Sequence, residues 1–365
     1  MTSDQLLSGY DYTLPSELIA QNPVTPRDHS RLLIIDSLNT HVHSFFYDLT
    51  NWLLPGDLLI LNNTQVIPAR LYGRKATGAP VEILLLEEKD HNCWLALVKP
   101  GKRFKLGSEI WFYPFDAAPN SPHNILKAKV IDRDAATGGR LLQFHVPDDQ
   151  SFLGVLEKFG QIPFPPYVNH SEALPSQYQT VYAHEPGSVA APTAGLHFTE
   201  ELLGRLKAMG VNLAYVTLHV GVGTFRPVEV EDITQHIMHQ EWIELPQETV
   251  DLIRETKAKG SRVIAVGTTA TRTLEGAMKE IKEAGGDELA AFRGKTNLFI
   301  YPSYQWQVVD GLITNFHLPK SSLLMLVSAL IGRERLLALY AEAIQKEYRF
   351  YSFGDAMLIL PSAVI

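Results

Sequence analysis

The feature that most constrains the fold of this chain is a change of sequence pattern between residues 66 and 146. In this segment, short β-rich runs alternate with turn residues such as Pro100-Gly101 and Gly138-Gly139. The runs that we predict to be strands are 69–72, 81–86, 94–98, 109–112, 126–131 and 141–146. Short strands at this spacing are typical of a small closed or nearly closed β-barrel.

On both sides of this segment the sequence predicts alternating strands and helices. The predicted strands are 31–35, 41–46, 58–61, 211–220, 262–266, 298–301 and 311–316, and the predicted helices are 15–20, 152–159, 199–209, 247–259, 269–284, 321–331 and 335–346. Such alternation favours an α/β fold with a mainly parallel sheet covered by helices. We therefore expect a discontinuous α/β domain, residues 1–62 and 149–365, interrupted by an inserted β-barrel domain, residues 63–148.

Composition excludes several classes of protein. The 365 residues suffice for two or three domains, and Cys93 is the only cysteine, which rules out an internal disulfide and a Cys-rich zinc site. The N-terminal segment lacks a signal-peptide pattern, and no run of about 18 uninterrupted apolar residues occurs. We expect a cytoplasmic protein with no membrane contact. A formal net charge of −8 argues against a general nucleic-acid coat but permits local basic patches.

The segment 262–275 is an apolar strand that continues through Gly267 into a Thr-rich helix start. The free backbone N–H groups of such a helix can hold a phosphate or a carboxylate. Thr268 and Thr269 either line this site or only cap the helix, and the residues alone leave both interpretations open. Gly221 and Gly223 are followed by a segment containing Pro227, so a dinucleotide fingerprint is excluded.

Polar residues also gather at other predicted strand and helix ends. His197 offers a proton carrier and Arg226 a cation for an anionic group. His219 alternates with apolar neighbours, which favours a hydrogen-bonded core histidine. Asn315, His317 and Lys320 can form a polar cluster above the sheet. The Pro-dense loop 161–167 is too stiff for a flexible linker, so we predict that it is packed or functional.

Two histidine pairs raise the question of a metal site. His41 and His43 can share one side of a strand, and His236 and His239 can share a helix face. Thirteen histidines make chance pairs common, and neither an H-E-x-x-H motif nor a cysteine ligand set is present. We therefore predict no metal site.

Six blocks of the sequence, taken together, resemble one known family. They are LNNTQVIPARL, APTAGLHFTEELL, TLHVGVGTFRPV, VIAVGTTATRTLE, FIYPSYQWQVVDGLITNFHLPKSSLL and FGDAMLI. The order and the residues of these blocks resemble the S-adenosylmethionine:tRNA ribosyltransferase-isomerase family of queuosine biosynthesis from about residue 10 to residue 360. The resemblance implies an α/β catalytic domain with an inserted β-barrel, in agreement with the pattern described above.

The resemblance also implies an unusual reaction. The ribosyl part of S-adenosylmethionine is transferred to the 7-aminomethyl-7-deazaguanine at the wobble position of tRNA and isomerised to an epoxide, and adenine and methionine leave. S-adenosylmethionine is consumed as a substrate, so no cofactor is expected. The expected partners are S-adenosylmethionine and a tRNA with a modified wobble guanine, and the chain is expected to act as a monomer. A metal-dependent hydrolase of a nucleoside-like substrate and a non-catalytic RNA-binding protein remain alternatives.

The matched blocks imply a set of site residues. The catalytic candidates are His197, His317 and Asp310, and the substrate-binding candidates are Thr193, Arg226, Thr268, Thr269, Arg272, Asn315 and Lys320. Of these, His197 and His317 are the leading acid–base pair, and Arg226 and Arg272 would hold anionic groups. The chain departs from the family pattern at Asn63, Gln65, Ser303 and Gln305, so no essential role is assigned there.

A local basic surface is expected on the inserted barrel. Residues 66–113 contain eight basic and five acidic residues, whereas the whole chain is acidic. Lys99, Lys102, Arg103 and Lys105 crowd the turn around Gly101, where flexible cations can follow a phosphate backbone. The alternative is a solvated hairpin tip. With tRNA as substrate, we predict that these four residues bind it.

Overall fold

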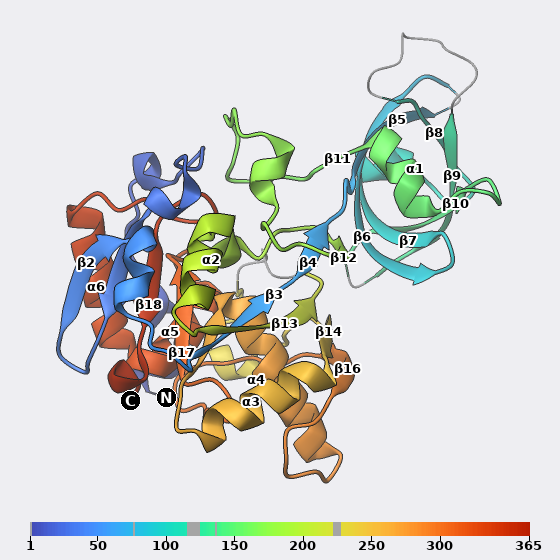
Figure 1. Ribbon diagram of the computed structural model, residues 1–365. Coiled ribbons are helices and arrows are strands. Elements are labelled where there is room, and N and C mark those ends of the chain that lie inside the picture. The colour runs from blue at the N-terminus through green and yellow to red at the C-terminus, as the bar shows by residue number, and fades with distance from the viewer. Residues whose placement is uncertain (1, 76, 115–124, 136, 222–227) are drawn as a thin grey trace. The chain divides into compact units, whose positions relative to one another are not determined.

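The computed structural model describes residues 2–75, 77–114, 125–135, 137–221 and 228–365, and the chain forms two compact units (Figure 1). The first unit comprises Met1–Thr64, Pro166–Glu185 and Ala191–Ile365, and the second comprises Gln65–Pro165 and Pro186–Ala190. Two of the four boundaries fall within short strands that pair with each other, β4 (Thr64–Val66) and β12 (Glu185–Ser188). The second unit therefore extends beyond the predicted end at residue 148.

A nine-stranded sheet, counted over the described residues, forms the centre of the first unit. Its order is β16 (Phe292–Thr296), β14 (Glu241–Leu245), β13 (Asn212–Leu218), β3 (Leu58–Asn62), β15 (Val263–Val266), β17 (Gly311–Asn315), β18 (Ala356–Ile359), β1 (Arg31–Ile35) and β2 (His41–Phe45). The central strands β13, β3, β15 and β17 are parallel, as are β18 and β1. The remaining neighbours are antiparallel. The sheet is therefore mixed, with parallel strands at its centre, and not mainly parallel as expected.

Several elements of this unit differ from the sequence prediction. Residues 298–301 do not form a strand. Leu298 and Ile300 are buried, which explains the alternating apolar pattern, but no strand pairs with this segment among the described residues. The strands β14, β16 and β18 were not predicted. The predicted helix 15–20 is a single 3₁₀ turn, Ser16–Leu18.

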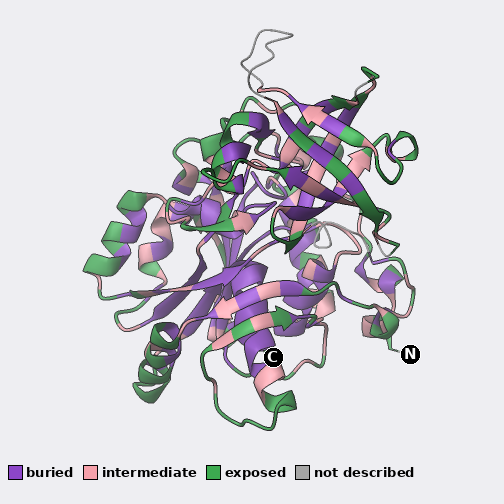
Figure 2. Ribbon diagram, turned by 90° about the vertical axis from the view of Figure 1, so that its right-hand side faces the viewer, coloured by how far each residue is buried: buried purple, intermediate pink, exposed green. Residues whose placement is uncertain are grey.

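Helices cover both faces of the sheet (Figures 1 and 2). On one face, Leu202 and Leu206 of α2 (Glu200–Ala208) share a core with Leu59 and Leu61 of β3. The helices α3 (Gln247–Ala258) and α4 (Gly267–Glu283) lie on the other face, and α5 (Ser322–Ile331) and α6 (Arg333–Gln345) follow β17. Each fully buried leucine contributes roughly 1.5–3 kcal/mol. Among the helices of the described residues, none has the length and apolar character that crossing a bilayer requires.

The second unit is a closed antiparallel barrel. Its strands, in order around the barrel, are β5 (Arg70–Lys75), β6 (Pro80–Asp90), β7 (Cys93–Lys99), β10 (Arg140–His145), β9 (Leu126–Arg133) and β8 (Glu109–Phe112), and β8 pairs back to β5. All six predicted strands are present. The helix α1 (Phe152–Phe159) extends the unit, because Phe152 packs on Trp94 and Phe144, and the following β11 (Gly160–Gln161) pairs with β5.

The close approach of two backbones at Gly160 gives a stability prediction. A Cβ added to Gly160 would lie 1.9 Å from the carbonyl oxygen of Pro68. We expect Gly160→Ala to lower the free energy of unfolding of the second unit by roughly 1–3 kcal/mol, since neither backbone can yield cheaply. Gly101→Ala is the matched control, because its nearest atom would be 3.8 Å away. Urea unfolding measures the stability of both variants, and hydrogen exchange of the β5 amides reports on the second unit. Equal stability of the two variants would contradict the steric argument.

Candidate functional site

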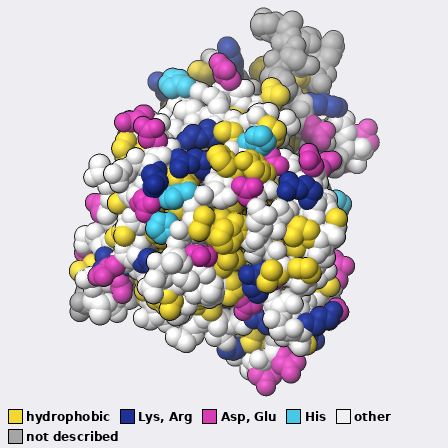
Figure 3. Space-filling view, turned by 60° about the vertical axis from the view of Figure 1, so that its left-hand side comes forward, with side chains coloured by type: hydrophobic (Ala, Val, Ile, Leu, Met, Phe, Trp, Pro, Cys, Tyr) yellow, Lys and Arg dark blue, Asp and Glu magenta, His cyan; other side chains and the backbone are white. Residues whose placement is uncertain are grey.

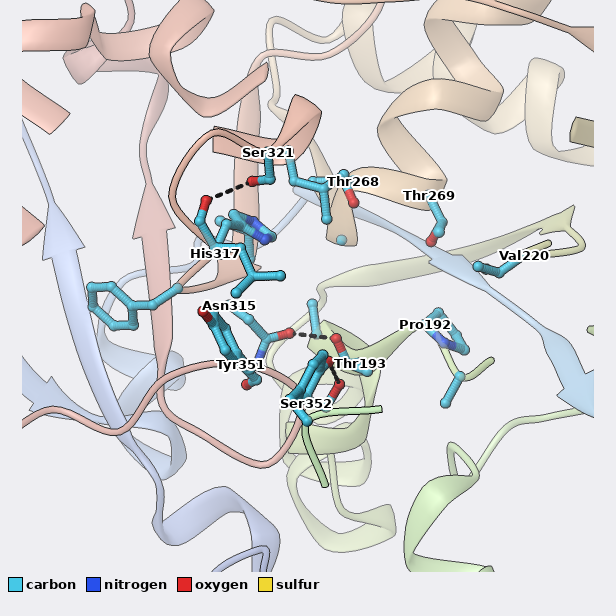
Figure 4. Close-up of a pocket in the computed structure, with 18 of the residues that line it drawn as sticks. Pro192, Thr193, Val220, Thr268, Thr269, Asn315, His317, Ser321, Tyr351 and Ser352 are labelled. Atoms are coloured by element: carbon cyan, nitrogen blue, oxygen red, sulfur yellow. Dashed lines mark hydrogen bonds between the residues drawn. The ribbon is translucent and has the colours of Figure 1, made fainter. Parts of the chain in front are cut away.

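A pocket of about 360 Å³ lies in the first unit (Figure 4). Its lining includes Thr268, which follows β15, His317, which follows β17, and Tyr351, which precedes the antiparallel β18. Thr193, in the 3₁₀ helix η8 (Thr193–His197), completes another side. The pocket thus lies at the carboxyl ends of the central parallel strands, where ligands bind in open α/β sheets.

The N-terminus of α4 forms one wall of the pocket. Gly267 has φ +86°, which only glycine adopts readily, and it turns the chain directly from β15 into the helix. Thr269 lines the pocket and is 9% exposed, yet its hydroxyl has no hydrogen-bond partner within the described structure. No threonine side chain caps this helix. The free N–H groups, the helix dipole and the Thr269 hydroxyl together form a site for an anionic group.

His317 supplies the imidazole of the pocket lining. Its Nε2 lies 2.7 Å from the Thr314 hydroxyl, and its backbone N–H donates to the Tyr340 hydroxyl at 2.9 Å. Burial lowers the pKa of His317 to about 3. The side chain is therefore neutral at pH 7 and able to accept a hydrogen bond.

His197 lies outside the pocket lining and is fully buried. Its Nδ1 is 2.6 Å from the Ser30 hydroxyl, and its Nε2 is 3.1 Å from an Arg27 nitrogen and 3.0 Å from the Asn315 amide nitrogen. Because both neighbours of Nε2 are donors, the ring proton is on Nδ1. Burial, and then the charges of Arg27 and Arg349, hold the pKa of His197 well below its usual range.

A continuous hydrogen-bonded chain connects His197 to the pocket. The Asn315 side-chain oxygen accepts a hydrogen bond from the Thr193 hydroxyl at 2.8 Å, and both Asn315 and Thr193 line the pocket (Figure 4). We call Arg27, His197, Asn315 and Thr193 the His197 chain. Through this chain, His197 fixes the orientation of polar groups in the pocket without entering it.

Two aromatic residues that the sequence did not single out face the pocket. The rings of Tyr167 and Tyr351 lie 4.8 Å apart between centroids, and the Tyr167 hydroxyl is 2.6 Å from the Ser352 hydroxyl. Burial raises the pKa of Tyr167 to about 12, so it remains a phenol. Tyr167 ends the Pro-dense loop 161–167, and that loop was the sequence feature that could have indicated it. The segment before β18 contains no such feature that indicates Tyr351.

The structure separates three predicted residues from the pocket. Asp310 lies at the amino end of β15, where its carboxylate accepts the Val263 N–H at 2.8 Å and pairs with Lys257 at 3.1 Å. The guanidinium of Arg272 pairs with Glu241 of β14, and both side chains are buried. Lys320 pairs with Asp11 at 2.7 Å. Each charged group therefore has a partner outside the lining.

Two further candidates have different outcomes. Arg226 lies outside the described residues. The imidazole of His219 is 2.8 Å from the Thr64 hydroxyl and stacks on Trp242 with centroids 5.0 Å apart. His219 is thus a hydrogen-bonded, packed histidine, as the sequence favoured.

The pocket does not offer a metal-ligand set. Among its described lining residues there is one imidazole and no carboxylate or thiol, whereas a catalytic zinc site uses three such ligands. This composition does not favour the metal-dependent hydrolase. The one His/Cys/Asp/Glu cluster with metal-compatible spacing in the described parts of the chain, His41, His43 and Glu342, lies elsewhere, at β2 and α6.

The predicted tRNA-binding residues lie together on the second unit. Lys99 ends β7, and Lys102 and Arg103 lie in the 3₁₀ helix Gly101–Arg103, with Lys105 two residues beyond. All four are exposed. The turn therefore presents its cations to solvent, as both the binding interpretation and the hairpin-tip alternative require.

Comparison with known proteins gives consistent matches. The family model described as "Queuosine biosynthesis protein" matches residues 7–359. Proteins named S-adenosylmethionine:tRNA ribosyltransferase-isomerase from Nostoc sp. (strain PCC 7120) and Acaryochloris marina are 63% and 60% identical over 99% of this chain, and 93% and 95% of their own lengths are covered. A crystal structure of S-adenosylmethionine tRNA ribosyltransferase from Thermotoga maritima is 40% identical, with 96% of this chain and 99% of that chain covered and a TM-score of 0.54.

The low pKa of His317 predicts how stability depends on pH. The unfolded chain takes up a proton at this residue below about pH 6.5, whereas the folded chain does so only near pH 3. Stability is therefore fully present above pH 6.5 and falls as the pH decreases toward 3. Between pH 7 and pH 5, His317 accounts for a loss of about 2 kcal/mol.

The comparison that tests this is the change in urea unfolding free energy from pH 7 to pH 5 within each variant. We expect His317→Asn to show a loss smaller by about 2 kcal/mol than the parent chain. His170→Asn is the control, because His170 is exposed in the same unit. If His317→Asn and His170→Asn have the same pH dependence as the parent, His317 is not the neutral buried group described.

Proposed function

This chain belongs to the queuosine biosynthesis protein family, and we propose that it is an S-adenosylmethionine:tRNA ribosyltransferase-isomerase. The support is the 60–63% identity to relatives of that name along nearly the whole chain. In the proposed reaction, the ribosyl group of S-adenosylmethionine moves to the 7-aminomethyl-7-deazaguanine at the wobble position of tRNA. It rearranges to the epoxide of epoxyqueuosine, and adenine and methionine leave. S-adenosylmethionine is consumed, and the proposal includes no separate cofactor.

The observation that carries the pocket assignment is the unpartnered Thr269 hydroxyl beside the N-terminus of α4. S-adenosylmethionine has a carboxylate, a sulfonium and an adenine. The carboxylate fits the free N–H groups and the Thr269 hydroxyl. The sulfonium and the adenine fit the rings of Tyr167 and Tyr351, since aromatic faces attract cations and stack on bases. A volume of about 360 Å³ lies within the range of small-molecule sites.

We assign proton transfer to His317 and positioning to His197. The reaction needs a base for a proton made acidic by the sulfonium, and His317 supplies the one imidazole among the described lining residues of the pocket. Both nitrogens of His197 are already hydrogen-bonded, so its proposed task is to hold Asn315 and Thr193 in place. Asp310, Arg272 and Lys320 are left out of the proposed site because their charges are paired elsewhere.

Binding of tRNA is proposed at the basic turn of the second unit, Lys99, Lys102, Arg103 and Lys105. The wobble base must be unstacked to reach a pocket, as in other enzymes that modify bases. The proposed substrate is a tRNA that carries the precursor base. We also propose that the chain works as a monomer, since all described pocket-lining residues come from one unit of one chain. The cytoplasm is the proposed location because a tRNA is the proposed substrate.

The direct test of function is adenine release from S-adenosylmethionine. With tRNA that carries the aminomethyl-deazaguanine precursor, we expect one adenine for each ribosyl group transferred. With tRNA that lacks this base, we expect only background release. Tight tRNA binding without adenine release would favour the non-catalytic RNA-binding alternative.

Removing the Thr269 hydroxyl tests the carboxylate site. We expect Thr269→Val to raise the KM for S-adenosylmethionine by about 10- to 100-fold, because a hydrogen bond to a charged group contributes about 1.5–3 kcal/mol. Stability should not fall, since the hydroxyl has no partner in the unliganded chain. Thr273→Val, in the same helix and hydrogen-bonded to the Thr269 carbonyl, is the control and should leave KM unchanged. An unchanged KM in Thr269→Val would place the carboxylate elsewhere.

Neutralising the basic turn tests the tRNA surface. The triple variant Lys102→Gln, Arg103→Gln and Lys105→Gln should raise the apparent Kd for tRNA and flatten its salt dependence by up to about three units of slope. Binding of S-adenosylmethionine should be unaffected. The control neutralises three exposed cations of β9 on the same barrel, Lys127, Lys129 and Arg133. If both triple variants weaken tRNA binding equally, the turn has no special role.

A further inference from the structure

His41 and His43 form a compact cluster with Glu342 in the first unit. Both histidines lie on the edge strand β2 at positions i and i+2, whose side chains share one face, and Glu342 comes from α6. The Nε2 atoms of His41 and His43 lie 3.0 Å and 2.9 Å from the two oxygens of the Glu342 carboxylate. One ligand atom from each of the three residues lies within 4.8 Å of the others. The cluster is three strands away from β17 and its pocket.

A further contact fixes one of these rings. The Nδ1 atom of His43 is 2.7 Å from the Tyr348 hydroxyl, and the Tyr348 ring packs under the Arg31 guanidinium at 3.7 Å. Because Tyr348 is buried, its hydroxyl cannot move away freely. Metal-bound imidazoles commonly have such a partner on their second nitrogen, and it orients the ring.

We propose that His41, His43 and Glu342 bind a divalent transition-metal ion of the Zn²⁺ class, with water as the fourth ligand. Two imidazole nitrogens and one carboxylate oxygen are a ligand set that Zn²⁺ uses. Ligand bonds of about 2.0–2.1 Å in a tetrahedron place ligand atoms about 3.3 Å apart. The two imidazoles now contact different oxygens of the Glu342 carboxylate, and the three ligand atoms lie within 4.8 Å of one another, so the side chains must draw together around the ion to complete the site.

The proton balance is consistent with this site. Without metal, the contacts fit tautomers in which each imidazole donates Nε2–H to Glu342, and the Tyr348 hydroxyl donates to His43 Nδ1. With metal, each imidazole carries its proton on Nδ1, and His43 then donates to the Tyr348 oxygen. The ion ties the edge strand β2 to α6. The site is separate from the proposed catalytic pocket, and the proposal does not depend on the proposed function.

The sequence indicated the His41–His43 pair but not its third ligand, which is remote, and we predicted no metal site there. Glu342 is 299 residues from His43, and nothing in the local pattern of either segment connects them. The accessible side chains suit exchange of a metal with solvent: Glu342 is about one third exposed, and the two histidines slightly less. The rival state is a pair of hydrogen bonds with no affinity for metal.

Metal titration of the full chain tests the proposal. After treatment with EDTA and its removal, we expect one Zn²⁺ per chain by calorimetry, and one Co²⁺ per chain with visible absorption typical of a four-coordinate site. His41→Ala and Glu342→Gln should each abolish stoichiometric binding, and Tyr348→Phe should weaken it about 10- to 100-fold. Circular dichroism confirms that each variant is folded.

The matched control is His184→Ala. His184 also pairs with a carboxylate, Glu185, at 2.9 Å, but without a second histidine. This variant should bind Zn²⁺ like the parent chain. The proposal is overturned if the parent chain binds no stoichiometric Zn²⁺, or if binding survives in the folded His41→Ala and Glu342→Gln variants.

Discussion

Both ring nitrogens of His197 are hydrogen-bonded inside the first unit, and through them four distant segments of the chain meet. Ser30 and Arg27 come from the N-terminal segment, Asn315 from the end of β17, and His197 from η8, while the Arg27 guanidinium also donates to the carbonyl of Ser352 at 3.3 Å. Each buried polar group that lost its partner would cost about 1–3 kcal/mol. Because no segment can shift alone without such a loss, the pocket walls are fixed relative to one another before any ligand binds.

The charges around this network have a chemical consequence. The lining residues of the described pocket are uncharged, and the positive ends of α4 and α5 reach the lining. Burial, and then the charge of Arg349, lower the pKa of Arg27 to about 9. The buried guanidinium therefore holds its proton less tightly than an exposed arginine does. A site without anionic side chains disfavours the protonated form of an incoming amine. The proposed reaction requires this, because only a neutral amine attacks the ribosyl group.

The sequence predicted local features well and long-range pairing poorly. The six barrel strands and α4 follow from turn residues and periodicity, which are local. The strands β14 and β18 depend on neighbours far along the chain, and Glu342 joins His41 and His43 only through the packing of α6 beside β2. Asp310 and Asn315 bracket the same strand, but Asp310 precedes β17 and Asn315 ends it. A cluster of polar residues in the sequence therefore indicates a strand end without indicating which end holds the site.

Backbone strain at Tyr351 shows how the pocket keeps its aromatic wall. Its φ of +70° is unfavourable for a bulky side chain and costs about 1–3 kcal/mol. Hydrogen bonds on both sides offset this cost: the Tyr351 N–H donates to the Phe316 carbonyl at 3.2 Å, and its own carbonyl accepts from Asn315 at 3.3 Å and from Gly354 at 2.9 Å. Since Asn315 is also bonded to His197, the strained conformation and the His197 chain support each other. The ring of Tyr351 is thereby held against Tyr167. A ligand that stacks on this ring therefore does not lose binding energy by ordering the ring.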